Sequence, residues 1–244
     1  MILITGGSRG IGAACALLAA KAGHLVAINY HSNEEAALAV LQSVKDAGSD
    51  GMIIQGDVGS AADIARIFRE ADGLGPLAGL VNNAGIVDRR QRVDEMGAER
   101  LERMMRVNVT GSILCAGEAV RRMSTRHGGK GGSIVNLTSA AAKLGAPGQY
   151  VDYAASKGAI DSFTIGLARE VAEEGIRVNA VRPGIIDTDI HASGGEPDRV
   201  AQMRSSVPMK REGSAEEVAQ AVVWLMSPAA SYVKGTTVDV TGGR

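Results

Sequence analysis

The chain has 244 residues, and its 26 Lys and Arg residues against 27 Asp and Glu residues give a formal net charge of −1. This balance argues against a strongly basic surface that binds nucleic acid and against an acidic solvating tail. The apolar fraction of 45% supplies a core. Because the apolar runs are too short to span a membrane, we expect one globular domain over residues 1–244 that engages neither nucleic acid nor membrane.

The cysteines and the N-terminus bear on the compartment. Cys15 and Cys115 are the two cysteines, and they lie far apart in the sequence, which excludes a disulfide framework. The first residues show no charged leader and no cleavage site, so we expect a cytoplasmic protein. The four histidines and two cysteines have no ligand spacing, so we expect no catalytic metal.

Short runs rich in Val, Ile and Leu alternate with helical patterns along the chain. The runs predict strands at Met1–Thr5, His24–Tyr30, Gly51–Asp57, Leu77–Asn82, Ser133–Ser139, Ile176–Arg182 and Thr236–Val240. Helices are predicted at Gly12–Ala22, Glu34–Ala47, Ala61–Ala71, Tyr153–Glu174 and Ala215–Met226. Because the strands show no polar alternation, they are typical of strands buried on both faces. The chain is therefore predicted to be α/β, with a parallel, doubly wound sheet and helices on both faces.

One segment, residues 185–213, does not follow this alternation. It is polar, longer than an ordinary connection, and contains Gly194, Gly195, Pro197 and Pro208. Since it begins where the sixth strand ends, and ligands bind beyond the carboxyl ends of such strands, we predict a substrate lid here. His191 within it is expected to be a solvated loop histidine rather than a substrate contact.

A glycine-rich turn follows the first strand. It reads Thr5-Gly6-Gly7-Ser8-Arg9-Gly10-Ile11-Gly12 and leads directly into a helix. Glycines let the backbone turn sharply and let a pyrophosphate approach, while the helix N-terminus offers free N–H groups. The turn favours a dinucleotide site, although a tight turn without ligand or a methyl-donor site would show the same residues.

The end of the second strand indicates which dinucleotide would bind. A site for NAD usually places Asp or Glu there to hold the ribose 2′-OH. The chain instead reads Asn29-Tyr30-His31-Ser32, and the first carboxylate is Glu34. Arg9 in the turn could reach a 2′-phosphate, which arginine binds well. We therefore expect NADP(H) as the cofactor, rather than NAD(H), with Asn29, His31 and Ser32 near its ribose.

Tyr153 is the tyrosine with a lysine four residues later, at Lys157. On a helix this spacing places both side chains on one face, about 5–6 Å apart at Cβ. A free phenol has a pKa of about 10, and a neighbouring ammonium lowers it, which would make the tyrosine an effective acid–base group. A surface pair of no function remains the alternative. Ser139, at the end of the fifth strand, and Asn108, in a helical stretch that disfavours asparagine, support the functional interpretation.

Together these residues resemble the short-chain dehydrogenase/reductase superfamily. The likeness rests on Thr5-Gly6-x3-Gly10-x-Gly12, Asn82-Asn83-Ala84-Gly85, Asn108, Ser139, Tyr153-x3-Lys157 and Pro183-Gly184, in this order over the whole chain. It is greatest toward members that reduce 3-oxoacyl carrier proteins or oxidise glucose. The resemblance implies a seven-stranded Rossmann sheet in the order 3-2-1-4-5-6-7 and a homotetramer.

The resemblance also implies the role of each site residue. Tyr153 would be the general acid/base, Lys157 would lower its pKa and bind the nicotinamide ribose, Ser139 would orient the substrate, and Asn108 would hold a water in a proton relay. The cofactor would lie along the glycine-rich turn from Gly6 to Gly12. Its other contacts would be Asp57 and Val58, Asn83, Ala84 and Gly85, and Pro183, Gly184, Ile186 and Thr188.

The substrate is less well determined. A carrier-protein reductase would need basic residues near the site, and Arg126 fits one such position whereas Glu174 reverses the charge at another. We expect a small carbonyl or secondary alcohol, with an oxoacyl thioester or a sugar as alternatives within the family. Arg89, Arg90 and Arg92 could favour an anionic substrate, although such a run is more often a solvated face. A non-catalytic NADP(H) sensor and a methyltransferase are the rivals from other classes.

Overall fold

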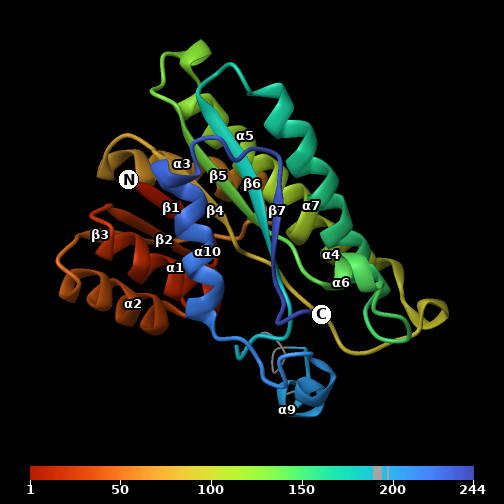
Figure 1. The fold of residues 1–244 in the computed structure, drawn as a ribbon. Coiled ribbons are helices and arrows are strands. Elements are labelled where there is room, and N and C mark those ends of the chain that lie inside the picture. Colours follow the sequence, from red (N-terminus) through yellow and green to blue (C-terminus); the bar gives the residue numbers. More distant parts are fainter. Residues whose placement is uncertain (189–193, 197) are drawn as a thin grey trace.

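The computed structural model spans residues 1–244 and describes residues 1–188, 194–196 and 198–244. Its centre is a parallel sheet of seven strands in the order β3-β2-β1-β4-β5-β6-β7, as predicted (Figure 1). The strands are β1 (Ile2–Ile4), β2 (Val26–Tyr30), β3 (Gly51–Gln55), β4 (Gly79–Asn82), β5 (Gly132–Leu137), β6 (Ile176–Pro183) and β7 (Thr237–Val240). Each lies within two residues of its predicted ends.

Two layers of helices cover the sheet. One face carries α1 (Gly10–Lys21), α2 (Glu34–Asp46) and α10 (Ala215–Met226). The opposite face carries α3 (Ala61–Ala71), α5 (Ser112–Met123) and α7 (Val151–Glu170). Successive strand residues alternate between the layers, because side chains along a strand point to opposite faces. Ile2 and Ile4 accordingly join the first cluster, and Leu3 joins the second.

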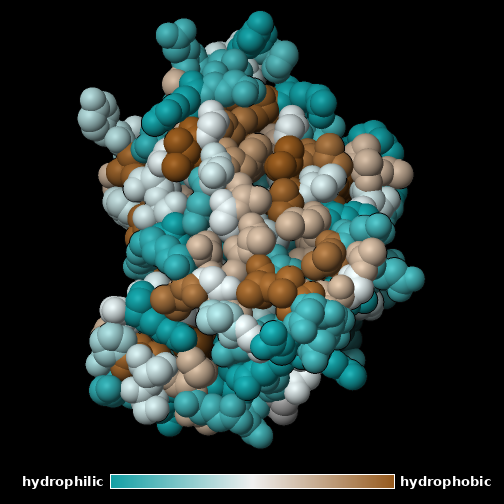
Figure 2. All heavy atoms as spheres, turned by 90° about the vertical axis from the view of Figure 1, so that its right-hand side faces the viewer, coloured by the Kyte–Doolittle hydropathy of each residue, from teal (hydrophilic) through white to brown (hydrophobic). Residues whose placement is uncertain are grey.

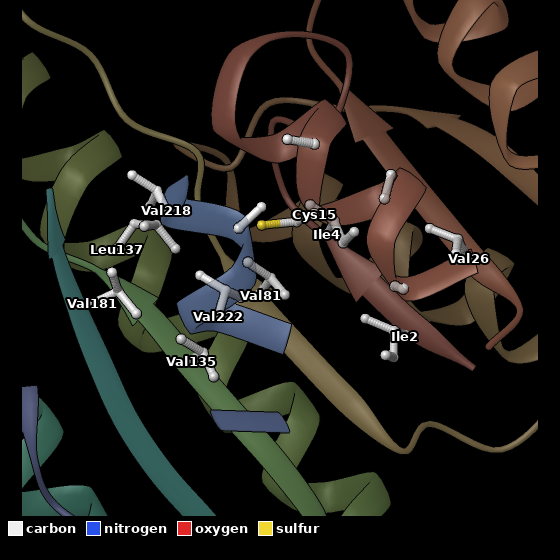
Figure 3. Packing of buried hydrophobic residues seen from close by; sticks show 14 of the residues in the cluster. Ile2, Ile4, Cys15, Val26, Val81, Val135, Leu137, Val181, Val218 and Val222 are labelled. Carbon is white, nitrogen blue, oxygen red and sulfur yellow. The ribbon is translucent and has the colours of Figure 1, made fainter. Parts of the chain in front are cut away.

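The first of these clusters shows why α1 and α10 lie where they do. Figure 3 shows Cys15 of α1 directed toward the side chains of α10, with Val218 and Val222 above the strand residues Val81 and Val135. All five side chains are buried. Small and β-branched residues at these positions bring both helices close to the sheet, which fixes the start of α1 just beyond the turn that follows β1.

Besides several 3₁₀ turns, four shorter helical elements complete the described part of the chain. They are α4 (Ala98–Met105), the short α6 (Ala141–Leu144), α9 (Arg199–Met203) and a π-helical turn at Arg106–Gly111. No helix in the described residues is both long enough and apolar enough to cross a membrane.

The predicted lid contains more structure than its polar composition suggested. Ile185, Ile186 and Val207 are buried, and α9 lies beyond the carboxyl ends of the strands (Figure 1). A parallel bridge joins Ile186 to Gly213, so the two ends of the segment meet. The expectation for His191 falls outside the described residues.

Candidate active site

In the glycine-rich turn, the backbone of the turn and the backbone at the start of α1 pack closely against each other. Gly6 and Gly10 have positive φ angles of 61° and 52°, which glycine adopts without strain. A Cβ at Gly12 would lie 2.4 Å from the carbonyl oxygen of Gly6. Arg9 precedes α1 in an extended conformation and makes no side-chain cap, so the helix N-terminus keeps N–H groups for a ligand. The turn has the shape that a pyrophosphate needs, and its contacts with a cofactor stay predictions.

Two asparagines hold this turn through backbone hydrogen bonds. Gly6 N donates to Oδ1 of Asn29 at 3.2 Å, and Nδ2 of Asn29 donates to the carbonyl oxygens of Ile54 and Gly56 at 3.2 and 3.1 Å. Nδ2 of Asn83 donates to the carbonyl oxygens of Thr5 and Gly6, both at 2.9 Å. The side chain of Asn29 is buried and occupied by these bonds, so it supports the turn rather than presenting its amide to a ligand.

The end of β2 carries no acidic side chain at the expected ribose position. His31, Ser32 and Arg9 are exposed there. Farther along the sheet edge, Oδ1 of Asp57 accepts a hydrogen bond from Gly59 N at 2.7 Å, and Val58 is buried beside it. This geometry leaves the edge open to a ribose phosphate, and the cofactor contacts of these residues stay predictions.

Tyr153 and Lys157 lie on one face of α7, as their spacing predicted. Nζ of Lys157 is 5.7 Å from the centroid of the Tyr153 ring and donates a hydrogen bond to the carbonyl oxygen of Leu137 at 2.8 Å. Burial lowers the pKa of Lys157 to about 8, although the charge of Asp161 acts in the opposite direction. The lysine is therefore anchored to the end of β5, directly beneath the tyrosine.

The expected lowering of the pKa of Tyr153 by Lys157 is wrong for this structure. Burial raises the pKa of Tyr153 above its ordinary value, because the phenolate would lose its hydration. The groups that oppose this rise are Ser139, through a side-chain hydrogen bond, and the positive charge of Arg199. The phenol is consequently protonated at neutral pH, which suits a proton donor.

Asn108 occupies the π-helical turn at Arg106–Gly111 and is fully buried. Its Oδ1 accepts a hydrogen bond from Ile86 N at 2.8 Å, and its Nδ2 donates to the carbonyl oxygen of Ile86 and to Oγ of Ser156. A Cβ added at Gly85 would lie 3.4 Å from both Oδ1 of Asn108 and Nζ of Lys157. Asn108 thus braces the segment beside Lys157, and a proton-relay role stays a prediction.

A single cavity of about 450 Å³ brings most of these groups together. The predicted residues that line it are Ile11, Asn83, Gly85, Ser139, Tyr153, Lys157, Pro183, Gly184, Ile186 and Thr188. It therefore joins the start of α1 to the face of α7 that carries Tyr153 and Lys157. The other predicted site residues lie outside the cavity wall. Some belong to the adjoining glycine-rich turn or to the segment after β4 beside it, namely Gly6, Ser8, Arg9, Gly10, Gly12 and Ala84. The rest are Asn29, His31, Ser32, Asp57, Val58 and Asn108. Among the described residues, no group of acidic, histidine or cysteine side chains could hold a metal ion.

Comparisons with known proteins agree with this geometry. The family model described as enoyl-(acyl carrier protein) reductase matches residues 6–244. The chain is 54% identical over 243 residues to the uncharacterized oxidoreductase YgfF of Escherichia coli K12, covering 99% of this chain and 98% of that protein. It is 36% identical over 242 residues to the 3-oxoacyl-[acyl-carrier-protein] reductase FabG of Staphylococcus aureus, covering 99% and 96%.

A solved structure shares the fold as well. A short-chain dehydrogenase from Burkholderia cenocepacia in complex with NADP is 33% identical, with a TM-score of 0.90, covering 99% of this chain and 96% of that one. The chain belongs to the short-chain dehydrogenase/reductase superfamily. It is accordingly an oxidoreductase, like the relatives of that superfamily named above.

The sequence analysis of this short-chain dehydrogenase/reductase missed a second polar group in the cavity wall. Tyr150 donates a hydrogen bond to the carboxylate of Glu196, and the guanidinium of Arg199 stacks 5.0 Å from the centroid of the Tyr150 ring. Arg199 is buried, and Arg244 lines the same cavity. The one signal in the sequence was Tyr150 itself, three residues before Tyr153. Nothing there indicated that Glu196 and Arg199 would be its partners.

Proposed function

We propose that this protein is an NADP(H)-dependent oxidoreductase that transfers a hydride between nicotinamide and a small carbonyl or secondary alcohol, with Tyr153 as general acid/base. The observation that carries the proposal is the common cavity of Tyr153, Ser139 and Lys157, which continues to the glycine-rich turn. A bound nicotinamide would supply the hydride. The chain itself would hold the carbonyl and move the proton.

The proton chemistry follows from the environment of Tyr153. Because its pKa is raised, the phenol holds its proton at neutral pH and can donate it to the oxygen of a carbonyl that becomes an alkoxide. Ser139 lies within hydrogen-bond reach of the same side chain, and its single hydroxyl proton can turn from Tyr153 to that oxygen as a second donor. In the reverse direction the same oxygen of Tyr153 would accept the proton of an alcohol.

The choice of NADP(H) rests on the sheet edge at β2. An NAD-specific site would have a carboxylate at the end of β2, and this carboxylate would repel a 2′-phosphate. Here the exposed His31 and Ser32 occupy that position, and Arg9 is exposed in the turn after β1. The NADP complex of the Burkholderia cenocepacia relative supports this choice. The ratio of kcat/KM for NADPH to that for NADH tests it, and a preference for NADH would overturn it.

The substrate class within the family follows from the surface near β6. Nη1 of Arg126 lies 3.9 Å from Oε1 of Glu174, and Oγ of Ser124 donates to the same carboxylate at 2.5 Å. Glu174 thus places a negative charge beside Arg126 on this surface, which disfavours an acidic carrier protein. A free small carbonyl is therefore favoured over an oxoacyl thioester, and over a sugar because the cavity wall is largely apolar.

We further propose a homo-oligomer, a tetramer by family resemblance. Large apolar side chains remain exposed on α4, α5 and α7, namely Leu101, Met105, Ile113, Leu114 and Ile165. Figure 2 shows apolar patches along the side of the molecule that carries α7. Exposed apolar area of this kind typically marks an interface. Light scattering at several protein concentrations tests this proposal.

The experiment that tests the catalytic role is a pair of tyrosine variants. Tyr153→Phe should bind NADPH with unchanged affinity in a fluorescence titration yet lose nearly all turnover of a ketone panel. Tyr232→Phe is the matched control, because Tyr232 is fully exposed. Binding of NADPH without turnover by the wild type would favour a sensor, and absence of binding would favour a site for another nucleotide.

A further inference from the structure

The charged side chains that line the cavity are all cationic. Its lining contains three cationic side chains, Lys157, Arg199 and Arg244, and no Asp or Glu among the described residues. Lys157 is accounted for, because it donates to the end of β5 beneath Tyr153. The proposed reaction gives the two arginines no role, although two like charges on one cavity, Arg199 buried and Arg244 partly buried, repel each other unless an anion lies between them.

Arg199 is held rigidly in this wall. Its side chain is only 10% exposed. Nη1 donates to Oε2 of Glu196 at 3.1 Å, Nη2 donates to Oε1 of Gln149 at 2.8 Å, and the ring of Tyr150 supports the guanidinium plane. A guanidinium has five N–H groups in a planar fork, so these contacts fix its orientation and leave donors for the cavity.

Arg244 places a second guanidinium on the same cavity. Burial and the positive charge of Arg199 lower the pKa of Arg244, so the two cations repel each other. Glu196 does not neutralise both arginines, because its carboxylate also pairs with Arg90. In the part of the chain that the structure describes, Arg244 pairs with no carboxylate. An anion between the two arginines would relieve this repulsion.

Resting on the proposed carbonyl chemistry, we propose that the substrate is a small carbonyl compound with an anionic group, which Arg199 and Arg244 bind while Tyr153 and Ser139 hold the carbonyl. The wall between these ends contains Leu144, Pro147 and Ile185, which fit a short hydrocarbon segment. Because the nicotinamide end of the cofactor would share this cavity, the space left suits a short oxo acid. A phosphorylated ketone presents the same anionic chemistry.

The test compares anionic substrates with neutral partners of the same shape. The carboxylate arm uses acetoacetate against methyl acetoacetate and 4-oxopentanoate against its methyl ester. The phosphate arm uses dihydroxyacetone phosphate against dihydroxyacetone. With NADPH, the wild type should show a higher kcat/KM for the anion in one of these arms. Arg199→Gln should reduce the ratio of anion to neutral partner by about 30-fold or more, as for loss of one partner of a buried charge pair.

Controls separate substrate binding from folding and from cofactor binding. Arg69→Gln removes an exposed arginine of α3 and should keep the wild-type ratio. Arg244→Gln should lower the ratio in the same direction as Arg199→Gln, which protects the test if one variant folds poorly. The Kd for NADPH should be the same in both cavity variants as in the wild type, because Arg199 contacts Gln149 and Tyr150 rather than the glycine-rich turn.

Three results would overturn the inference. The first is that the wild type uses neutral and anionic partners equally well. The second is that both cavity variants keep the wild-type ratio. The third is that the affinity for NADPH falls in parallel with turnover in these variants, because that result would assign the arginines to a cofactor phosphate. In each of these cases carbonyl reduction itself survives. If the wild type turns over neither member of any pair nor any other ketone, the proposed function fails together with the inference.

Discussion

The pair of Arg100 and Asp152 makes a prediction that can be quantified. Nε of Arg100 lies 2.7 Å from Oδ2 of Asp152, and Nη2 lies 3.0 Å from Oδ1, a two-pronged contact between α4 and the first turn of α7. The side chains are 9% and 1% exposed. Arg100→Met would leave the carboxylate buried without its counter-charge, which costs about 3–5 kcal/mol of the free energy of unfolding.

Thermal unfolding is the assay for this prediction. For a chain of this size each kcal/mol corresponds to roughly 2–4 °C in Tm, so Arg100→Met should lower the Tm by about 6–20 °C. The matched control is Arg204→Met, which removes a half-exposed partner of Glu212 and should cost at most about 1 kcal/mol. The double variant Arg100→Met/Asp152→Asn should regain part of the loss, because it no longer buries a lone charge. A Tm for Arg100→Met no lower than that of Arg204→Met would refute this reasoning.

Three further predictions follow from single groups. His31→Asp should lower the preference for NADPH over NADH about tenfold or more, because a carboxylate repels the 2′-phosphate; an unchanged ratio of kcat/KM values would contradict the placement of that phosphate. Burial raises the pKa of Cys15 and Cys115 to about 12, so both thiols should resist a thiol reagent in the native protein and react at once in denaturant. Burial lowers the pKa of Lys157 to about 8, so between pH 8 and 10 the unfolded chain binds more protons than the folded chain. The free energy of unfolding should therefore rise with pH over this window, and by more in the wild type than in Lys157→Met, as denaturant titrations at several pH values would measure.

Much of the scaffold could be predicted from the sequence because its signals are local. A strand covered on both faces is mostly apolar, and β1, with the sequence Ile-Leu-Ile, is therefore recognisable as a continuous apolar run. The helix at Ala215–Met226 matches its predicted bounds, and Ser214 and Glu217 cap its start reciprocally. The spacing of Tyr153 and Lys157 is likewise a local property of a helix.

The unpredicted features depend on contacts between distant segments. The polar composition of residues 185–213 indicated a lid but not that Arg199 would be buried on Tyr150, 49 positions earlier in the chain. The predicted direction of the pKa of Tyr153 was wrong because sequence spacing reveals a neighbouring lysine but not the loss of hydration around the phenol. The place of Asn29 near the cofactor stays a prediction, and the sequence did not show that its amide would bond to the backbone of two other segments.

The most direct test of the account follows the hydride and the proton together. NADPH that carries deuterium in place of both hydrogens at C4 of the nicotinamide should be incubated with a ketone that the wild type accepts. Mass spectrometry should then find one deuterium on the carbinol carbon of the alcohol, with turnover lost in Tyr153→Phe and kept in Tyr232→Phe. An alcohol without deuterium, or full turnover by Tyr153→Phe, would contradict the central claim that Tyr153 serves a carbonyl reduced by NADPH in this cavity.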